Sequence, residues 1–212
     1  MAGPGLRERK KQQTRDAIAA AAMTLFTERG FEAVTVAEVA EAADVSTATV
    51  FNYFPTKEDL VYSRLEAFEE ALLSAIRERP PGESVLDAFG RFILDRALQG
   101  AGRDFGTRVA TISRMITASP ALLARERQIV AAYAEALAGL IAEETGAAAD
   151  DIRPRVAAGA LMAVHRSLID YARQRALSGR ASRKLASDLE AEGKRALALL
   201  AGGLGDYAVK PG

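Results

Sequence analysis

The stretch TVAEVAEAADVSTATVFNYF, residues 35–54, decides the fold. Thr35 and Glu38 have the spacing of a capping box, in which the hydroxyl group accepts from the third amide and the carboxylate reaches back. They predict that a helix begins just after Thr35. Ser46 is of a residue type that often caps a helix, so a second helix is expected to begin after it. This helix is expected to end near Phe54, which precedes a proline. Two short helices joined by a tight turn are typical of a helix-turn-helix.

The second of these helices has an unusual surface, because no residue from Val45 to Thr56 is charged. Val50 and Phe54, four residues apart, are expected to face inward. The remaining surface offers small polar groups and aromatic rings, which fit a DNA major groove about 12 Å wide. The alternative is a partly solvated helix with no partner. The outward and flanking positions are Thr47, Ala48, Thr49, Phe51, Asn52 and Tyr53.

Helical periodicity continues on both sides of this stretch and predicts an all-α protein. A first helix is expected from about Arg9 to Arg29, where Gly30 ends it and Phe31 folds back onto Phe26 or Leu25. Aromatic residues make up only 6% of the chain, which suits helices better than sheets. Later helices are expected at 57–79, 84–99, 104–118, 120–145, 151–178 and 183–203, with linkers at 100–103, 146–150 and 179–182.

The amino-acid composition argues against several kinds of chemical site. The chain has no cysteine and one histidine, so a disulfide framework, a thiolate nucleophile and a structural zinc site are not expected. No apolar stretch approaches the roughly 18 residues of a membrane helix, and a cytoplasmic protein without membrane contact is expected. A net charge of zero argues mildly against nucleic acid, although residues 6–16 hold five basic groups against two acidic ones.

A set of short motifs between Thr14 and Leu65, specific in combination, resembles the TetR family of bacterial transcription regulators. The motifs are Thr14-Arg15, Ala21-Ala22, Leu25-Phe26, Gly30-Phe31, Thr35-Val36, Val39-Ala40, Ala43, Val45-Ser46, Thr49 and the run from Tyr53 to Leu60.

The resemblance implies an N-terminal arm and helix-turn-helix domain over residues 1–56. It implies a helical ligand-binding and dimerisation domain over 57–212, with 57–79 as a connecting helix. Such a regulator binds palindromic double-stranded operator DNA as a homodimer and is released by a small ligand, with repression the more frequent outcome. The implied base contacts are Thr47, Ala48, Thr49 and Asn52, and the implied phosphate contacts are Thr35, Tyr53 and Lys57.

Two positions depart from the family pattern. Asp44 stands where glycine is usual in the turn, and aspartate tolerates the left-handed region better than most residues. Phe51 stands where tyrosine is common, so this position has no hydroxyl group for a phosphate hydrogen bond and only its packing remains.

The C-terminal part is expected to bind a ligand and a second copy of the chain. It resembles the subgroup with mycofactocin-regulator-like, acyl-coenzyme A-sensing domains, which implies an acyl-CoA thioester or another lipophilic effector and no bound cofactor. Candidate pocket residues include methionines and aromatic groups that adapt to a ligand's shape, but each also fits an ordinary core. They are Phe89, Phe92, Ile93, Met115, Ile116, Met162 and His165.

The last two helices suit a dimer interface, since one carries small residues and the other an apolar seam. The same surfaces would also serve to close the core of a single chain. The residues are Ala157, Ala158, Gly159, Ala160 and Ala163 in the first, and Leu185, Leu189, Ala196, Leu197 and Leu200 in the second.

Two other classes of protein compete with a DNA-binding regulator. A helical enzyme needs titratable groups that converge in a cleft, whereas the acidic pairs here are adjacent on helices and diverge. No catalytic residue is therefore expected. A helical lipid-binding or protein-interaction module would explain an apolar pocket but not the uncharged, hydroxyl-rich helix at 47–53.

Overall fold

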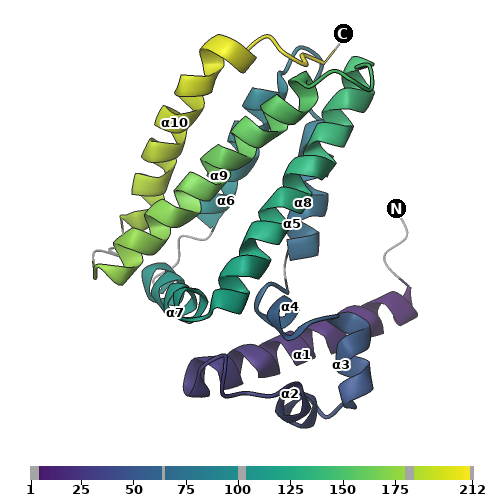
Figure 1. The fold of residues 1–212 in the computed structure, drawn as a ribbon, viewed down its shortest axis with the longest axis vertical. Coiled ribbons are helices and arrows are strands. Elements are labelled where there is room, and N and C mark those ends of the chain that lie inside the picture. The colour runs from purple at the N-terminus through teal and green to yellow at the C-terminus, as the bar shows by residue number, and fades with distance from the viewer. Residues whose placement is uncertain (1–4, 64, 100–103, 180–183, 211–212) are drawn as a thin grey trace. The chain divides into compact units, whose positions relative to one another are not determined.

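The computed structural model describes residues 5–63, 65–99, 104–179 and 184–210, and this described part is helical without any strand (Figure 1). The all-α expectation is confirmed. The expected linkers at 100–103 and 180–182 lie outside the described residues. The helices are α1 Leu6–Arg29, α2 Val36–Ala42, α3 Thr47–Tyr53, α4 Lys57–Val61, α5 Leu65–Arg77, α6 Val85–Gln99, α7 Phe105–Ala118, α8 Pro120–Thr145, α9 Arg153–Leu177 and α10 Leu185–Leu204.

The chain forms two compact units. The first contains Met1–Leu65 together with Met115–Arg125, and the second contains Glu66–Arg114 and Glu126–Gly212. Helices α7 and α8 therefore each contribute residues to both units. The expected division after residue 56 differs from this grouping, because α4 and the α7–α8 corner belong to the first unit.

The first unit has a continuous apolar core. Helix α1 contacts α2 and α4, and α2 contacts α3. The ring of Phe31 meets that of Phe26 edge to face, with centroids 5.1 Å apart, as expected from the sequence. Gly30 between the helix and this contact has φ 84°, which glycine adopts without steric cost. The fully or largely buried members are Ile18, Ala22, Phe26, Phe31, Val34, Val39, Ala40, Val50, Phe54, Leu60, Met115, Ile116 and Leu122.

The second unit is a bundle in which the long helices run roughly along one direction (Figure 1). Helix α10 packs on α6 and α9, and glycines permit the close approach. A Cβ atom at Gly90 would lie 2.9 Å from Leu197, and one at Gly193 would lie 2.6 Å from Leu94. A larger side chain at either position would require the facing leucine side chain to shift.

The structure corrects one expected element, the continuous helix over 57–79. Helix α4 ends at Val61 and α5 begins at Leu65. The carbonyl oxygen of Ser63 accepts a hydrogen bond from Arg15 at 3.3 Å, and Tyr62 leaves the helical conformation with ψ 27°. Residues 57–79 therefore do not form a single connecting helix, and Arg15 binds the chain at the interruption.

Candidate functional site

The first helix of the helix-turn-helix begins with the expected capping box. The Thr35 hydroxyl accepts from the Glu38 amide at 3.3 Å and donates to the Glu38 carboxylate at 2.8 Å. Glu38 also receives the Thr35 amide and an ion pair from Arg29 at 2.6 Å. The Thr35 amide, the Arg29 guanidinium and the Thr35 hydroxyl lower the pKa of Glu38 to about 2. The hydroxyl hydrogen of Thr35 is thus in use, and a phosphate contact from it would have to replace the bond to Glu38.

The turn between α2 and α3 adopts the geometry that Asp44 was expected to tolerate. Asp44 has φ 52°, in the left-handed region that glycine usually occupies. Its amide donates to Glu41, and the amide of Val45 donates to Ala40 at 3.0 Å. The turn is therefore closed by backbone hydrogen bonds without a glycine.

Helix α3 presents most of its predicted base-contacting residues to solvent. Val50 and Phe54 are buried in the core, as their spacing predicts. Thr47, Ala48 and Asn52 are exposed on the other side. Thr49 is half-buried.

The position of Thr49 has a local cause. Its hydroxyl lies 2.8 Å from that of Ser46, whose side chain caps α3 by accepting from the Thr49 amide. A base contact from Thr49 would therefore have to compete with this cap.

The two remaining predicted phosphate contacts lie at the ends of α3 and α4. Tyr53 is half-buried, and its carbonyl oxygen accepts from Arg15 at 3.2 Å. The Lys57 ammonium lies 4.2 Å from the centroid of the Phe31 ring, a cation–π distance. Arg15 stacks similarly on Phe54 at 4.7 Å, so cationic side chains brace the aromatic edge of this core.

Within the first unit, the α7–α8 corner is bonded to the N-terminal segment at three places, which sequence reasoning missed. The buried Ser119 hydroxyl donates to Glu32 at 2.6 Å. The Tyr62 hydroxyl donates to the backbone carbonyl of Leu122 at 3.0 Å. Arg125 pairs with Asp59, the residue whose other carboxylate oxygen caps α4. Partners 60 or more residues apart leave no signal in local sequence.

The predicted ligand-lining residues separate into two groups. Phe89, Ile93 and Met162 are buried in the second unit, where Phe92 and His165 are half-buried. Met115 and Ile116 instead belong to the core of the first unit with Leu122. The sequence groups them with the others because it does not show that the end of α7 packs with the helix-turn-helix.

Phe68 of α5 is the centre of an aromatic cluster in the second unit. Its ring stacks on His165 at 4.9 Å and on Tyr133 at 5.3 Å, and meets Phe92 edge to face at 5.5 Å. The Arg96 guanidinium lies 5.2 Å from the same ring. Burial, and secondly the charge of Arg96, lower the pKa of His165 to about 4. His165 is therefore a neutral histidine stacked in a partly buried cluster.

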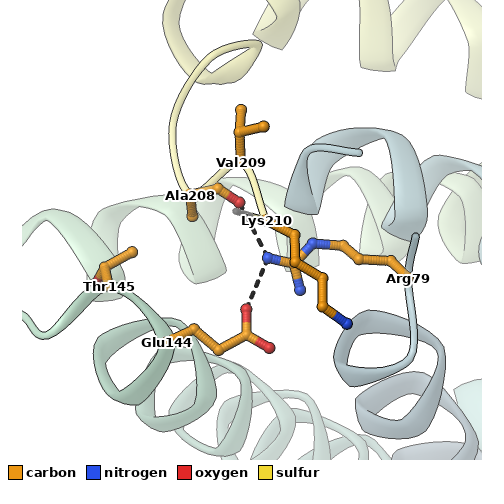
Figure 2. A pocket seen from close by; sticks show the side chains of 6 residues that line it. All are labelled: Arg79, Glu144, Thr145, Ala208, Val209 and Lys210. Atoms are coloured by element: carbon orange, nitrogen blue, oxygen red, sulfur yellow. Dashed lines mark hydrogen bonds and ion pairs between the residues drawn. The ribbon is translucent and has the colours of Figure 1, made fainter. Parts of the chain in front are cut away.

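A charged pocket of about 160 Å³ lies elsewhere in the second unit, lined by Arg79, Glu144, Thr145 and residues 208–210 (Figure 2). Arg79 is 2% exposed and pairs with Glu144 at 2.7 Å. It also donates to the carbonyl oxygens of Ile76, Glu83 and Ala208. The guanidinium thus ties the chain's C-terminal segment to the α5–α6 turn, and the role that fits these bonds is structural.

The surfaces expected to form a dimer are partly used within the chain. Leu185 and Leu189 are buried, as are Ala157 and Ala158. Other residues of the same helices face solvent. Val156 is 59% exposed and Leu199 is 85% exposed, and the exposed small residues near them are Gly159, Ala163, Ala198 and Gly202.

Comparison with known proteins gives the class to which this arrangement belongs. Residues 18–62 match the family model described as bacterial regulatory proteins, tetR family, and residues 83–204 match the MftR C-terminal domain. The HTH-type transcriptional regulator TcmR of Streptomyces glaucescens is 36% identical over 170 residues, covering 77% of this chain and 75% of that protein. The putative mycofactocin biosynthesis transcriptional regulator MftR of Mycobacterium tuberculosis is 24% identical over 170 residues, covering 77% and 81%.

Solved structures share the fold. FadR from Bacillus subtilis in complex with stearoyl-CoA aligns with a TM-score of 0.54 at 20% identity, over 88% of this chain and 97% of that one. The SmeT–triclosan complex aligns with a TM-score of 0.57 at 17% identity, over 94% and 96%. Among the residues that the structure describes, no helix is both long and apolar enough to cross a membrane.

The chain belongs to the TetR family of bacterial transcription regulators, with a C-terminal domain of the MftR type. It is a ligand-responsive DNA-binding regulator and not an enzyme.

Proposed function

We propose that this regulator is a homodimeric repressor, that α3 of each subunit reads one half of a palindromic operator, and that a lipophilic effector releases the DNA. The exposed, uncharged face of α3 carries the proposal. Thr47, Ala48 and Asn52 are held outward by a helix whose inner side is fixed in the core. Thr49 is a base contact only if it exchanges its bond to Ser46.

Phosphate contacts are assigned to Tyr53, Lys57 and Thr35, which lie at helix ends around this face. Lys57 supplies the positive charge, and Tyr53 supplies a hydroxyl donor. Thr35 contributes only if its hydroxyl leaves Glu38. Such contacts position the protein on DNA without reading sequence.

A dimer through the exposed faces of α9 and α10 fits the proposal. Val156 and Leu199 are large apolar side chains left in solvent, and the small residues beside them permit two helices to approach closely. Two copies of each helix would form a four-helix bundle.

The effector class rests on the MftR-type domain and on the apolar interior of the second unit. Stearoyl-CoA, which carries a long apolar acyl chain on a charged coenzyme A group, and the largely apolar triclosan are present in structures that share this fold. An acyl-coenzyme A thioester is the first candidate, and Phe89, Phe92, Ile93, Met162 and His165 are the proposed lining. Because Met115 and Ile116 are core residues of the first unit, their proposed role is to transmit the signal.

The proposal is tested by titrating octanoyl- and palmitoyl-coenzyme A into a preformed protein–DNA complex. The DNA is taken from the region upstream of the gene that encodes this chain. Release of DNA by either compound, with a coupling of about 5- to 150-fold in affinity, is expected. Tight thioester binding with unchanged DNA affinity would contradict the release mechanism. No binding of either thioester would contradict only the effector class, and no specific DNA complex would contradict the assignment of α3.

A further inference from the structure

Phe51 is an aromatic side chain that the core of the first unit does not use. It is 47% exposed, whereas its neighbours Val50 and Phe54 on the same helix are 0% and 1% exposed. From the sequence, Phe51 was expected on a flank of the outward surface of α3, and in the structure the ring is half exposed and not part of the core. Thr47 and Ala48 precede Phe51 by four and three residues, so all three share one side of α3. Their exposed methyl groups and the ring together form an apolar patch.

The composition of α3 limits which base edges it can read. No Lys or Arg lies between Val45 and Thr56, so this stretch lacks the side chains that most often read guanine. The hydroxyl of Thr49 is bonded to Ser46. What remains outward is the hydroxyl of Thr47, the amide of Asn52 and the apolar patch. In the major groove the apolar group presented by a base is the C5-methyl of thymine, which Ala, Thr and Phe side chains contact.

We propose that Phe51, with Ala48 beside it, reads thymine C5-methyl groups and thereby sets an A·T preference in each operator half-site. This inference rests on α3 being the DNA-reading helix. Phe51 is then a specificity-determining residue and not a replacement for a phosphate-binding tyrosine. Its ring contributes to base recognition, whereas the tyrosine common at this position offers a hydroxyl group for a phosphate.

Methyl deletion in the DNA tests this directly. DNA sites are first selected from a random pool with the native protein, and each thymine is then replaced singly by deoxyuridine. Uracil pairs with adenine as thymine does and lacks only the methyl group. Native protein is expected to bind about fourfold more weakly for each methyl that it buries, the value of one buried methylene-sized group. The effect should occur at one or two positions in each half-site.

The Phe51→Ala variant, measured on the thymine and uracil operators, completes a double-mutant cycle between the ring and the methyl group. It is expected to bind the thymine operator more weakly and to be indifferent to uracil at the sensitive positions. Asn52→Ala is the matched control, because it removes a neighbouring side chain on α3 and should keep the full uracil effect. Low salt strengthens phosphate contacts and keeps the weaker variants measurable. An unchanged thermal unfolding curve for Phe51→Ala checks that the fold is intact.

Three results would overturn the inference. In the first, uracil substitution at every position leaves the affinity of the native protein unchanged. In the second, the Phe51→Ala variant is as sensitive to uracil as the native protein. In the third, the Phe51→Ala variant binds all DNA sequences more weakly by the same factor. The last would place the ring against the sugar–phosphate backbone. Each leaves DNA binding by the native protein intact, whereas failure to select any DNA would contradict the DNA-reading role of α3 itself.

Discussion

Arg125 forms an ion pair with Asp59 at 2.7 Å, and this pair joins the first turns of α8 to the capping box of α4. With Ser119 on Glu32, it makes the α7–α8 corner a part of the helix-turn-helix unit. Helices α7 and α8 also contribute to the second unit. Since the helix over 57–79 is interrupted, we infer that the effector signal enters through residues 115–125 and not through one rigid connecting helix.

Replacing Arg125 by Gln is expected to reduce the coupling between effector and DNA. The measured quantity is the ratio of DNA affinities with and without the thioester that releases the complex. We expect this ratio to fall severalfold, while effector affinity of the DNA-free protein changes little. Arg153→Gln is the matched control, because the exposed Arg153 pairs with Asp151 within the second unit. An undiminished ratio in the Arg125 variant would exclude the corner as the route.

Lys57→Met should weaken binding to all DNA sequences equally, because it removes the positive charge that we propose neutralises a phosphate. Methionine keeps the length of the side chain beside Phe31. The slope of log affinity against log salt should shrink by about 0.9 for each phosphate that the protein no longer neutralises. Lys57→Arg retains the charge and should keep the slope. If Lys57→Met instead changes the preferred base at one position, Lys57 is a base contact.

Tyr53→Phe removes only the phenolic hydroxyl, so it tests the second proposed phosphate contact. We expect affinity for all sequences to fall by a similar factor, with the order of preferred sites unchanged. Competition assays with a panel of single-base operator variants measure this. A reordered panel would mean that the hydroxyl reads a base.

The single histidine makes the aromatic cluster measurable by NMR, because His165 gives the only imidazole signals. They should titrate with a pKa of about 4. Since the folded pKa lies below the ordinary 6.5, the neutral form is favoured by folding, and stability falls as the pH drops from about 6.5 to 4. The decrease is on the order of 3 kcal/mol and should be absent in His165→Phe. Arg96→Gln should raise the pKa, and titration of the native residue near 6.5 would contradict its burial.

The proposed dimer predicts that charge on the exposed faces of α9 and α10 gives monomers. Val156→Glu combined with Leu199→Glu is expected to do this without unfolding the chain, because both side chains face solvent in one subunit. Sedimentation equilibrium measures the association. Leu177→Glu, at a side chain 40% exposed near the end of α9, is a control for added charge. A dimer unaffected by the double change would place the interface elsewhere.

Local hydrogen-bond signals made much of the first unit predictable. Thr35 and Ser46 each cap the helix expected after them, and Asp44 takes the left-handed conformation. These outcomes depend on residues within about four positions of one another. The capping box at Thr56 also marks the start of α4 as expected.

Features that depend on distant residues were not predictable. Helix α4 stops where Arg15, almost fifty positions earlier, bonds to Ser63. The cluster around Phe68 joins four helices whose order in space no sequence period reveals. Among the proposed DNA contacts, the Thr35 hydroxyl was already expected to cap α2, and the structure adds that the Thr49 hydroxyl is bonded to the Ser46 cap.

Selection of bound DNA from a random pool, with the unmodified protein, tests the central claim most directly. Two α3 helices related by a dimer axis should enrich an inverted repeat whose half-sites are centred about 34 to 36 Å apart, one turn of DNA, or a multiple of it. The same selection with Asn52→Ala should change the preferred base at matching positions of both half-sites. Enrichment of no sequence, or of a single half-site without its inverted copy, would contradict operator reading by a symmetric dimer.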